Sequence, residues 1–392
     1  MMGEFDRVID RKGTSCIKWD RGGAKFQTDR ELLPLWIADT DFRAPPAVME
    51  AIAARTGHGI FGYSFCGRDY AEAVCDWLGR RHGLTVEWEW VSATTGVVTA
   101  MYFAVLALTE VGDQVMTLTP IYDPFYAVVK NTGRTLVRCP LLRQEDTYRL
   151  DLAAMEEGFR QGVKVLLFCN PHNPTGRVWT REELACVARL CKQYDVRLIS
   201  DEIHGDFALF GHRYTSFLAL EEIHDRLVMC SSAGKSFNLA GLGTAHTIIP
   251  NPDIREAVDG ALRGAWIMSP NILGAVAAKA AYQQGGAWMD EQRAYLEENS
   301  RFVRAYFQQH LPRVQLARHE GTFLMWMDFS CFDLPGGTLC QELAKQCGVG
   351  LGSGAVYAKE YGQFVRMNIG CARSILERAC QALGERYRTL GL

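Results

Sequence analysis

The sequence predicts an α/β protein with two parts: a large three-layer domain around a mostly parallel sheet, and a smaller α+β domain. Three observations lead to this prediction. The 392-residue chain is 48% hydrophobic, which suits about two domains that each bury a core. Short apolar runs alternate with amphipathic segments through the middle of the chain. This alternation stops near Gly285, beyond which the pattern changes.

Four apolar runs in the middle of the chain have the length of buried strands. They span residues 114–118, 163–169, 196–200 and 227–231. Amphipathic segments of helical length lie between them, at residues 122–131, 152–160 and 181–194. Thr180, three residues before Glu183, predicts a capping box at the start of the last helix. This order predicts parallel strands with helices on both faces of the sheet.

The chain beyond residue 285 has a different pattern. We expect a long, charge-rich helix, a strand, a helix, a strand and a closing helix, at residues 288–310, 323–329, 338–347, 364–369 and 374–390. The N-terminal segment has no strong periodicity and stops at Pro45–Pro46, so we expect an arm that packs on the smaller unit or the active site. The predicted organisation is an N-terminal arm that joins the small domain, a large domain and a small C-terminal domain, over residues 1–46, 47–285 and 286–392.

The composition argues against several classes of protein. Lys and Arg total 42 and Asp and Glu total 45, so the net charge of −3 gives no strong field for nucleic acid or an anionic membrane. The most apolar stretch, residues 261–282, is interrupted by Arg263, Pro270 and Lys279, so we expect no membrane span. The thirteen cysteines form no CxxC pair, which predicts no metal site and no disulfide framework. Free thiols favour a reducing compartment, and we expect a cytoplasmic protein.

Polar groups follow the predicted strands at their carboxyl ends, where open parallel sheets bind ligands. Asn173 follows the strand at 163–169, Asp201 follows that at 196–200, and Lys235 follows that at 227–231. A further segment, residues 93–96, precedes an expected apolar helix at 97–108. One crevice would then hold an amide, a carboxylate, an amine and a helix N-terminus with free N–H groups.

Pyridoxal phosphate requires this set of groups. Its aldehyde forms a Schiff base with a lysine, and its ring nitrogen needs an acid partner to act as an electron sink. Its phosphate suits a helix N-terminus, and its ring stacks on an aromatic face. Lys235, Asp201, the turn at 96–98 and Tyr122 meet these four demands. Taken singly, each has an ordinary structural explanation, such as a surface lysine or a helix cap; their joint occurrence at strand ends favours the cofactor.

Eight motifs support a resemblance that covers nearly the whole chain. They are LPLWIADTDF (33–42), GYSF (62–65), TTGVV (94–98), IYDPFY (121–126), NPHNPTG (170–176), DEIHGD (201–206), SSAGKSFNLAGL (231–242) and VRMNIGCAR (365–373). Together they resemble fold-type I pyridoxal-phosphate enzymes of the class I/II aminotransferase superfamily. More closely, they resemble its MalY/PatB group of cystathionine β-lyases, also called cysteine-S-conjugate β-lyases. The resemblance implies a large domain with the fold of the pyridoxal-phosphate-dependent transferases.

The resemblance implies a role for each matching residue. Lys235 would form the Schiff base and remove the substrate α-proton, and Asp201 would pair with the ring nitrogen. Asn173 would donate to the ring hydroxyl, Tyr122 would stack on the ring, and Arg366 would bind the substrate carboxylate. The phosphate would be held by Gly96, Val97, Val98 and Ser232, with Tyr63 reaching in from the partner subunit of a homodimer.

Other residues of the motifs keep two interpretations. His204 is a candidate contact of the cofactor, yet it could only bond within its own loop beside Asp206. Trp36 is a candidate for substrate binding at an entrance shaped with Asp39 and Asp41, or it is an apolar plug. Arg373 is expected as a surface charge at a helix start. Gly234 departs from the family, which often has Ser or Thr immediately before the lysine.

The reaction that the resemblance implies is β-elimination of a thiol from cystathionine or an S-substituted cysteine, with pyruvate and ammonia as further products. The same residues would also serve an aminotransferase, so the preference for a lyase follows from the resemblance alone. A third hypothesis is a pyridoxal-phosphate-binding regulator or partner-binding protein. We expect no fused DNA-binding region, because the N-terminal arm is too short for a helix-turn-helix domain.

Overall fold

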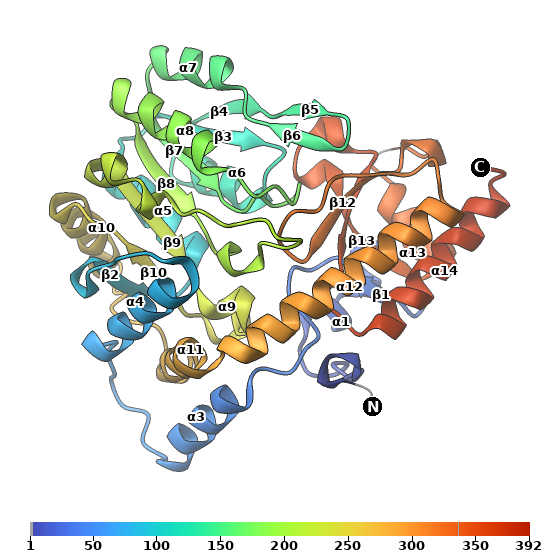
Figure 1. The fold of residues 1–392 in the computed structure, drawn as a ribbon, viewed down its shortest axis with the longest axis horizontal. Coiled ribbons are helices and arrows are strands. Elements are labelled where there is room, and N and C mark those ends of the chain that lie inside the picture. The colour runs from blue at the N-terminus through green and yellow to red at the C-terminus, as the bar shows by residue number, and fades with distance from the viewer. Residues whose placement is uncertain (1–2, 336) are drawn as a thin grey trace.

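A seven-stranded sheet forms the centre of the larger part of the computed structural model, which describes residues 3–335 and 337–392 (Figure 1). Its strands, in spatial order, are β2 (Val91–Thr94), β10 (Ala245–Ile248), β9 (Leu227–Ser231), β8 (Arg197–Asp201), β7 (Val163–Cys169), β3 (Gln114–Thr119) and β4 (Thr135–Pro140). β10 runs antiparallel to both of its neighbours, and the other pairs in the sheet are parallel. The predicted mostly parallel sheet is therefore confirmed.

Helices cover both faces of this sheet, and the side chains of β7 show why. Leu166 and Phe168 belong to one hydrophobic core, and Val165 and Leu167 belong to another. One core is closed by α4 (Arg68–His82), α7 (Leu152–Arg160), α8 (Arg181–Gln193) and α11 (Ile272–Gln284). The other is closed by α5 (Val97–Leu108), α6 (Asp123–Asn131) and α10 (Pro252–Gly264). These are the three layers that the sequence predicts.

A second sheet lies in the smaller part of the molecule. Its five strands, in spatial order, are β1 (Leu33–Leu35), β13 (Val349–Ser353), β14 (Phe364–Asn368), β12 (Leu324–Asp328) and β11 (Gln315–Leu316). β1 pairs in parallel with β13, so the N-terminal arm supplies an edge strand of this sheet. Its helices are α12 (Gly286–His310), α13 (Leu339–Cys347) and α14 (Arg373–Thr389). The domain limits at residues 46 and 285 stay a prediction, with which this pairing agrees.

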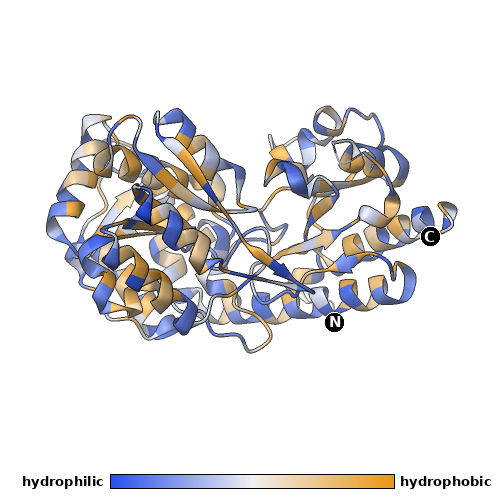
Figure 2. Cartoon of the chain, turned by 90° about the horizontal axis from the view of Figure 1, so that it is seen from above, coloured by the Kyte–Doolittle hydropathy of each residue, from blue (hydrophilic) through white to orange (hydrophobic). Residues whose placement is uncertain are grey.

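The two sheets lie side by side and α12 runs along both parts of the molecule (Figure 1). Hydrophobic residues concentrate in the strands and on the inner faces of the helices, while outer faces are hydrophilic (Figure 2). The remaining α-helices and strands are the arm helices α1 (Ile17–Asp20) and α2 (Gly22–Phe26), α3 (Pro46–Gly57), the short α9 (Ala233–Ser236), and a hairpin of β5 (Leu142–Gln144) and β6 (Thr147–Arg149).

Several local predictions can be compared with the structure directly. β7, β9, α5 and α7 have the predicted bounds, and the other predicted elements differ by one or two residues. Thr180 and Glu183 form the expected reciprocal capping box at α8. All thirteen cysteines are free. Within the described ranges, no helix is long and apolar enough to cross a membrane.

Candidate active site

A cavity of about 200 Å³ opens at the carboxyl ends of β7, β8 and β9 and at the N-terminus of α5. This is the edge at which open α/β sheets bind ligands. Nine residues singled out from the sequence line it, namely Gly96, Val97, Val98, Tyr122, Asn173, Asp201, His204, Ser232 and Lys235. The strand order therefore brings together residues that are up to 139 positions apart in the chain, from 96 to 235.

Lys235 lies in α9, directly after β9, and its Nζ donates a hydrogen bond to the carbonyl oxygen of Ala38 at 2.5 Å. Burial and the nearby Arg366 guanidinium lower its pKa to about 8, against the opposing effect of Asp39 and Asp201. An amine with this pKa has a substantial neutral fraction near neutral pH. Lys235 can therefore act as a nucleophile or a base.

Asp201 ends β8, and its Oδ1 accepts a hydrogen bond from the backbone N–H of Ile203 at 3.1 Å. Burial raises its pKa to about 7, while the Ile203 N–H and the charge of Lys235 partly oppose this shift. A buried carboxylate gains free energy from a cationic N–H partner, because such a partner offsets the cost of its desolvation. The site thus favours a ligand that brings a protonated nitrogen to Asp201.

Arg366, on β14 of the smaller sheet, does not line the cavity itself but bonds to Asn173, which does, so the site adjoins both sheets. Its Nη1 donates to Oδ1 of Asn173 at 3.1 Å, and its Nη2 donates to the carbonyl of Trp36 at 2.9 Å. The ring of Tyr357 lies 5.2 Å from the guanidinium carbon. The Nε of Arg366 is buried and has no partner in the described part of the chain. Donors therefore remain for a planar anion such as a carboxylate.

The N-terminus of α5 forms another wall of the cavity. Gly96 is its N-cap residue and makes no side-chain cap, so the first-turn N–H groups of Val97 and Val98 are available to an anion. Ser232 donates its hydroxyl to the carbonyl of Thr244 at 2.5 Å and accepts from the N–H of Gly234 at 2.8 Å. Its donor is thus used within the loop, and its predicted phosphate contact requires the hydroxyl to rotate.

Gly234 explains the departure from the family pattern before the lysine. A Cβ at this position would lie 2.9 Å from Oγ of Ser232, closer than such atoms normally approach. The N–H of Gly234 is also the donor that Ser232 uses to cap α9. Glycine at position 234 therefore leaves room for the Ser232 hydroxyl to cap α9, the short helix that carries Lys235.

His204 and Asp206 have different surroundings although they lie in one motif. His204 lines the cavity, where burial lowers its pKa well below the usual value and keeps it neutral. Its Nδ1 has no partner in the described chain, and its ring packs 5.7 Å from that of Phe323. Asp206 instead lies behind α9, where it accepts hydrogen bonds from Trp77, His82 and Ser236.

The predicted entrance residues form contacts that the sequence did not indicate. The Trp36 indole packs against Phe26 and bonds to the carbonyl of Lys18, and Trp36 reaches Arg366 only through its own carbonyl. Asp41 is buried in an ion pair with Lys18 rather than placed at an entrance. The expectation that Asp41 shapes an entrance is therefore wrong, because this carboxylate faces buried cations inside the arm.

Two further expectations concern residues outside the cavity. Arg373 does begin a helix, α14, but it is not a solvated surface charge. It is half-buried, donates to Oδ1 of Asn299 at 2.8 Å and lies over the ring of Phe302. Tyr63 is fully exposed in the single chain and does not line its cavity.

Several residues that shape the site were missed from the sequence. They are Ala38, whose carbonyl contacts Lys235, the cavity-lining Thr99 and Thr244, the ring of Tyr357, and the arm cations Arg11 and Lys18. A backbone carbonyl carries no sequence signal, and arm cations resemble ordinary surface charges. The available signal was the motif at 33–42, whose two aspartates interrupt an apolar run.

A lysine, a carboxylate and an arginine that converge between two sheets, at the strand ends of the larger one, define an α/β enzyme of the aminotransferase-like fold. The chain matches the family described as aminotransferase class I and II over residues 30–383, and it belongs to this family.

Three relatives illustrate its closer similarities. The chain is 39% identical to cystathionine beta-lyase PatB of Bacillus subtilis, with 95% of this chain and 97% of that protein covered. It is 34% identical to protein MalY of Escherichia coli, with 97% and 98% covered. The solved structure of cystalysin from Treponema denticola, which contains pyridoxal 5'-phosphate, superposes with a TM-score of 0.96 at 30% identity and covers 100% of both chains.

Proposed function

We infer that the protein is a pyridoxal-phosphate-dependent carbon–sulfur β-lyase. It eliminates a thiol from cystathionine or another S-substituted cysteine, and one water then hydrolyses the remaining three-carbon product to pyruvate and ammonia. The observation that carries this proposal is a cavity lined by Lys235 and Asp201, with Arg366 bonded to its lining residue Asn173. The chain is also 39% identical to a cystathionine β-lyase over nearly its full length.

The residues of the cavity fit pyridoxal phosphate. Asp201 is a buried carboxylate suited to a protonated ring nitrogen, and Lys235 is an amine with a lowered pKa suited to an aldehyde. The uncapped N-terminus of α5 suits the phosphate. Arg366 occupies the amide oxygen of Asn173, so the amide NH2 of Asn173 remains for the ring hydroxyl. We assign the face of the ring to Tyr122, and His204 would be a further, neutral neighbour of the cofactor.

The bound cofactor supplies an electron sink for the substrate α-carbon. The chain supplies the remaining steps. Arg366 binds the substrate carboxylate through donors that its protein partners leave free, which fixes the α-carbon above Lys235. Lys235, as the neutral amine, removes the α-proton. The resulting ammonium donates its proton to the carbonyl of Ala38 in a hydrogen bond, as in the structure.

Elimination and amino transfer share these residues, and the similarity to named cystathionine β-lyases favours elimination. The two reactions differ in one requirement, because amino transfer needs a keto acid to accept the amine. The test is incubation of the holoenzyme with L-cystathionine and no keto acid. Pyruvate and free thiol support the lyase, whereas turnover only after a keto acid is added overturns it. L-alanine, which lacks a leaving group, is the matched substrate control and should give no continuing release of pyruvate, at most one per active site, without a keto acid.

We assign the protein a homodimer in which Tyr63 of each subunit reaches the phosphate of the other. The support is an exposed apolar surface on residues that follow α3 and α10, formed by Ile60, Phe61, Tyr63, Phe65, Trp266 and Met268. Such a surface is unusual on a monomer and is typical of an interface. The free cysteines support a cytoplasmic location. Light scattering at several protein concentrations tests the dimer, and a mass of one chain of 43.9 kDa contradicts it.

A further inference from the structure

Residues 36–42, here called the strap, cross from the smaller sheet to the cofactor cavity. The carbonyl of Trp36 accepts a hydrogen bond from Nη2 of Arg366 at 2.9 Å. Two residues later, the carbonyl of Ala38 accepts from Nζ of Lys235 at 2.5 Å. One short piece of backbone therefore contacts both the proposed base and the proposed carboxylate receptor. Its position fixes where these two groups lie relative to each other.

Side chains from both parts of the molecule hold the strap through its backbone. Nδ2 of Asn368 donates to the carbonyls of Ile37 and Asp39, each at 2.6 Å. Nδ2 of Asn238 donates to the carbonyl of Phe42 at 2.8 Å. The two Asn368 contacts fall on either side of Ala38, and the Asn238 contact lies at the end of the strap. Charged side chains add a further hold at Asp39 and Asp41.

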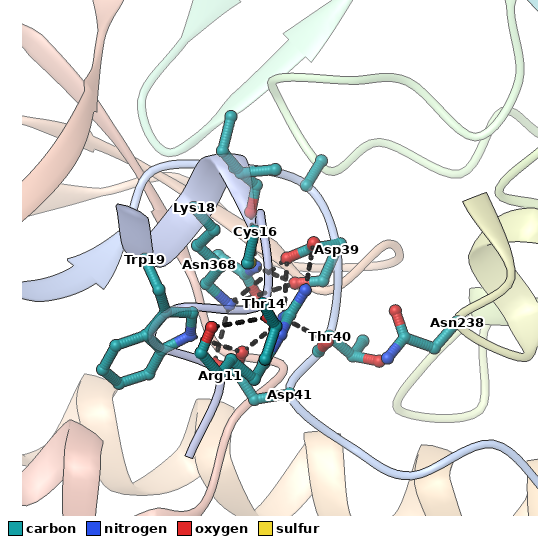
Figure 3. A network of polar contacts seen from close by, with 12 residues as sticks. Arg11, Thr14, Cys16, Lys18, Trp19, Asp39, Thr40, Asp41, Asn238 and Asn368 are labelled. Carbon is teal, nitrogen blue, oxygen red and sulfur yellow. Dashed lines mark hydrogen bonds and ion pairs between the residues drawn. The ribbon is translucent and has the colours of Figure 1, made fainter. Parts of the chain in front are cut away.

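Four charged side chains form this hold, here called the clamp: Arg11, Lys18, Asp39 and Asp41 (Figure 3). Lys18 is fully buried and lies 2.8 Å from Asp41 and 3.6 Å from Asp39. Arg11 lies 2.9 Å from Asp39 and 2.6 Å from Asp41, and it also donates to the carbonyl of Thr40 at 3.1 Å. Each cation thus bridges both strap carboxylates, on either side of Thr40.

The clamp is electrostatically matched although two of its members, Lys18 and Asp41, are buried. Burial alone would raise the pKa of Asp41, yet Lys18, Trp19 and Arg11 together hold it below its usual value. A buried ion pair of this kind contributes little net stability, because desolvation offsets the attraction. What it does provide is one fixed geometry, since each carboxylate is held from two sides and loses one of its two cations when Arg11 or Lys18 is removed. This makes geometry, rather than stability, the property to test.

We propose that Arg11 and Lys18 are positioning residues that hold Asp39 and Asp41 and thereby fix the Ala38 carbonyl against Nζ of Lys235. The catalytic consequence of this positioning rests on the proposed function, in which Lys235 gains a proton from the substrate. The fixed Ala38 carbonyl then accepts a hydrogen bond from the protonated Lys235 side chain. The groups that face Lys235 are Arg366, Asp39, Asp201 and His204. None of the four is a backbone acceptor, so the Ala38 carbonyl has a distinct part in stabilising the ammonium.

The test compares Arg11→Gln and Lys18→Met with the control Lys12→Gln in the cofactor-free full chain. Lys12 lies in the same arm and pairs with Glu31 at 2.6 Å, but its side chain is 53% exposed and does not touch the strap. The control therefore loses the same charge without loosening the clamp. The measurement is the pH dependence of acetylation of Lys235 by acetic anhydride, read by mass spectrometry, with thermal unfolding as a check on folding.

The direction of the shift separates positioning from simple charge loss. Removing a cation would by itself raise the pKa of Lys235, because the remaining field favours its protonated form. Losing the hydrogen bond to the Ala38 carbonyl lowers the pKa of Lys235. We therefore expect the acetylation midpoint to fall by about one pH unit, which is the scale of one hydrogen bond to a charged group. A midpoint in Arg11→Gln that stays at the wild-type value or moves upward overturns the proposal. If Lys18→Met does not fold, Arg11→Gln decides alone, because its side chain is 23% exposed and Lys18 remains in place.

This measurement needs neither cofactor nor turnover, so it is independent of the proposed lyase activity. If the acetylation midpoint of Lys235 falls in the variants but the wild-type holoenzyme does not cleave L-cystathionine, the positioning role of Arg11 and Lys18 is supported and the lyase function is refuted. In the active holoenzyme we expect the acid limb of the kcat profile to move in the same direction in Arg11→Gln. A uniform loss of kcat at every pH, with an unmoved limb, would show a merely structural role and overturn the proposal.

Discussion

Replacement of Arg366 by lysine is the sharpest single perturbation of the substrate side of the site. The guanidinium has five N–H donors, and the structure assigns one contact each to Asn173 and Trp36. Lysine keeps the charge and could keep one of these contacts, but it cannot present a planar pair of donors to a carboxylate. We therefore expect the loss of one charge-assisted hydrogen bond to the substrate, which is worth about 1.5–3 kcal/mol.

That free energy corresponds to an increase in KM of about 10- to 150-fold, because each 1.4 kcal/mol is a factor of ten. We expect kcat to change less, since the carboxylate is bound before and during proton transfer. The assay is the initial rate of pyruvate formation from L-cystathionine, coupled to lactate dehydrogenase.

Arg373→Lys is the matched control for this variant. Arg373 lies in the same sequence motif but bonds to Asn299, away from the cavity, so its KM should stay near the wild-type value. A KM for Arg366→Lys within about twofold of wild type, far below the expected range, would refute the carboxylate assignment. An equal rise in KM for both variants would refute it as well.

Three other substitutions probe the surroundings of the lysine. Asp201→Asn should retain the cofactor, seen by its visible absorption, yet lower kcat by about 100-fold or more, the scale of one preorganised electrostatic contact; near-normal kcat would contradict the pairing with the ring nitrogen. Gly234→Ser should weaken cofactor binding, measured by fluorescence titration, because its Cβ would meet Oγ of Ser232 at 2.9 Å; unchanged affinity would show that the hydroxyl moves freely. Asp206→Asn should lower the free energy of unfolding by about 1–3 kcal/mol near neutral pH. Burial opposes ionisation of Asp206, but His82 and Ser236 outweigh it and lower its pKa, so its contribution exists above the unfolded pKa and is lost as pH falls. Urea unfolding at several pH values should therefore show the wild-type advantage shrinking in acid, and a constant difference would contradict this account.

The centre of the fold could be predicted because its strands carry their own signal. β7 and β9 are continuous apolar runs bounded by polar turns, so both ends are visible in the sequence. β10, with the sequence AHTI, and β1, with LPL, are too short and mixed to stand out. The positions of β1 and β10 depend on pairing with strands that are distant in sequence, and the local sequence pattern gives no information about such pairing.

The cofactor side of the site was predictable for a related reason. Strand order sends the ends of β7, β8 and β9 to one edge, so polar residues just past them must converge there. The ion pair of Lys18 and Asp41, in contrast, could not be predicted from the strand order. Their pairing depends on how the arm folds back over β14, and a buried lysine resembles a surface lysine in sequence.

The most direct test of the central claim is the release of pyruvate and thiol from L-cystathionine by wild type and by Lys235→Ala, with no keto acid present. We expect wild type to release both products in equal amounts, and Lys235→Ala to release neither and to lose the visible absorption of the bound cofactor. Equal release by the two proteins would contradict the role given to Lys235. No release by a wild-type enzyme that carries its cofactor would contradict the assignment as a lyase.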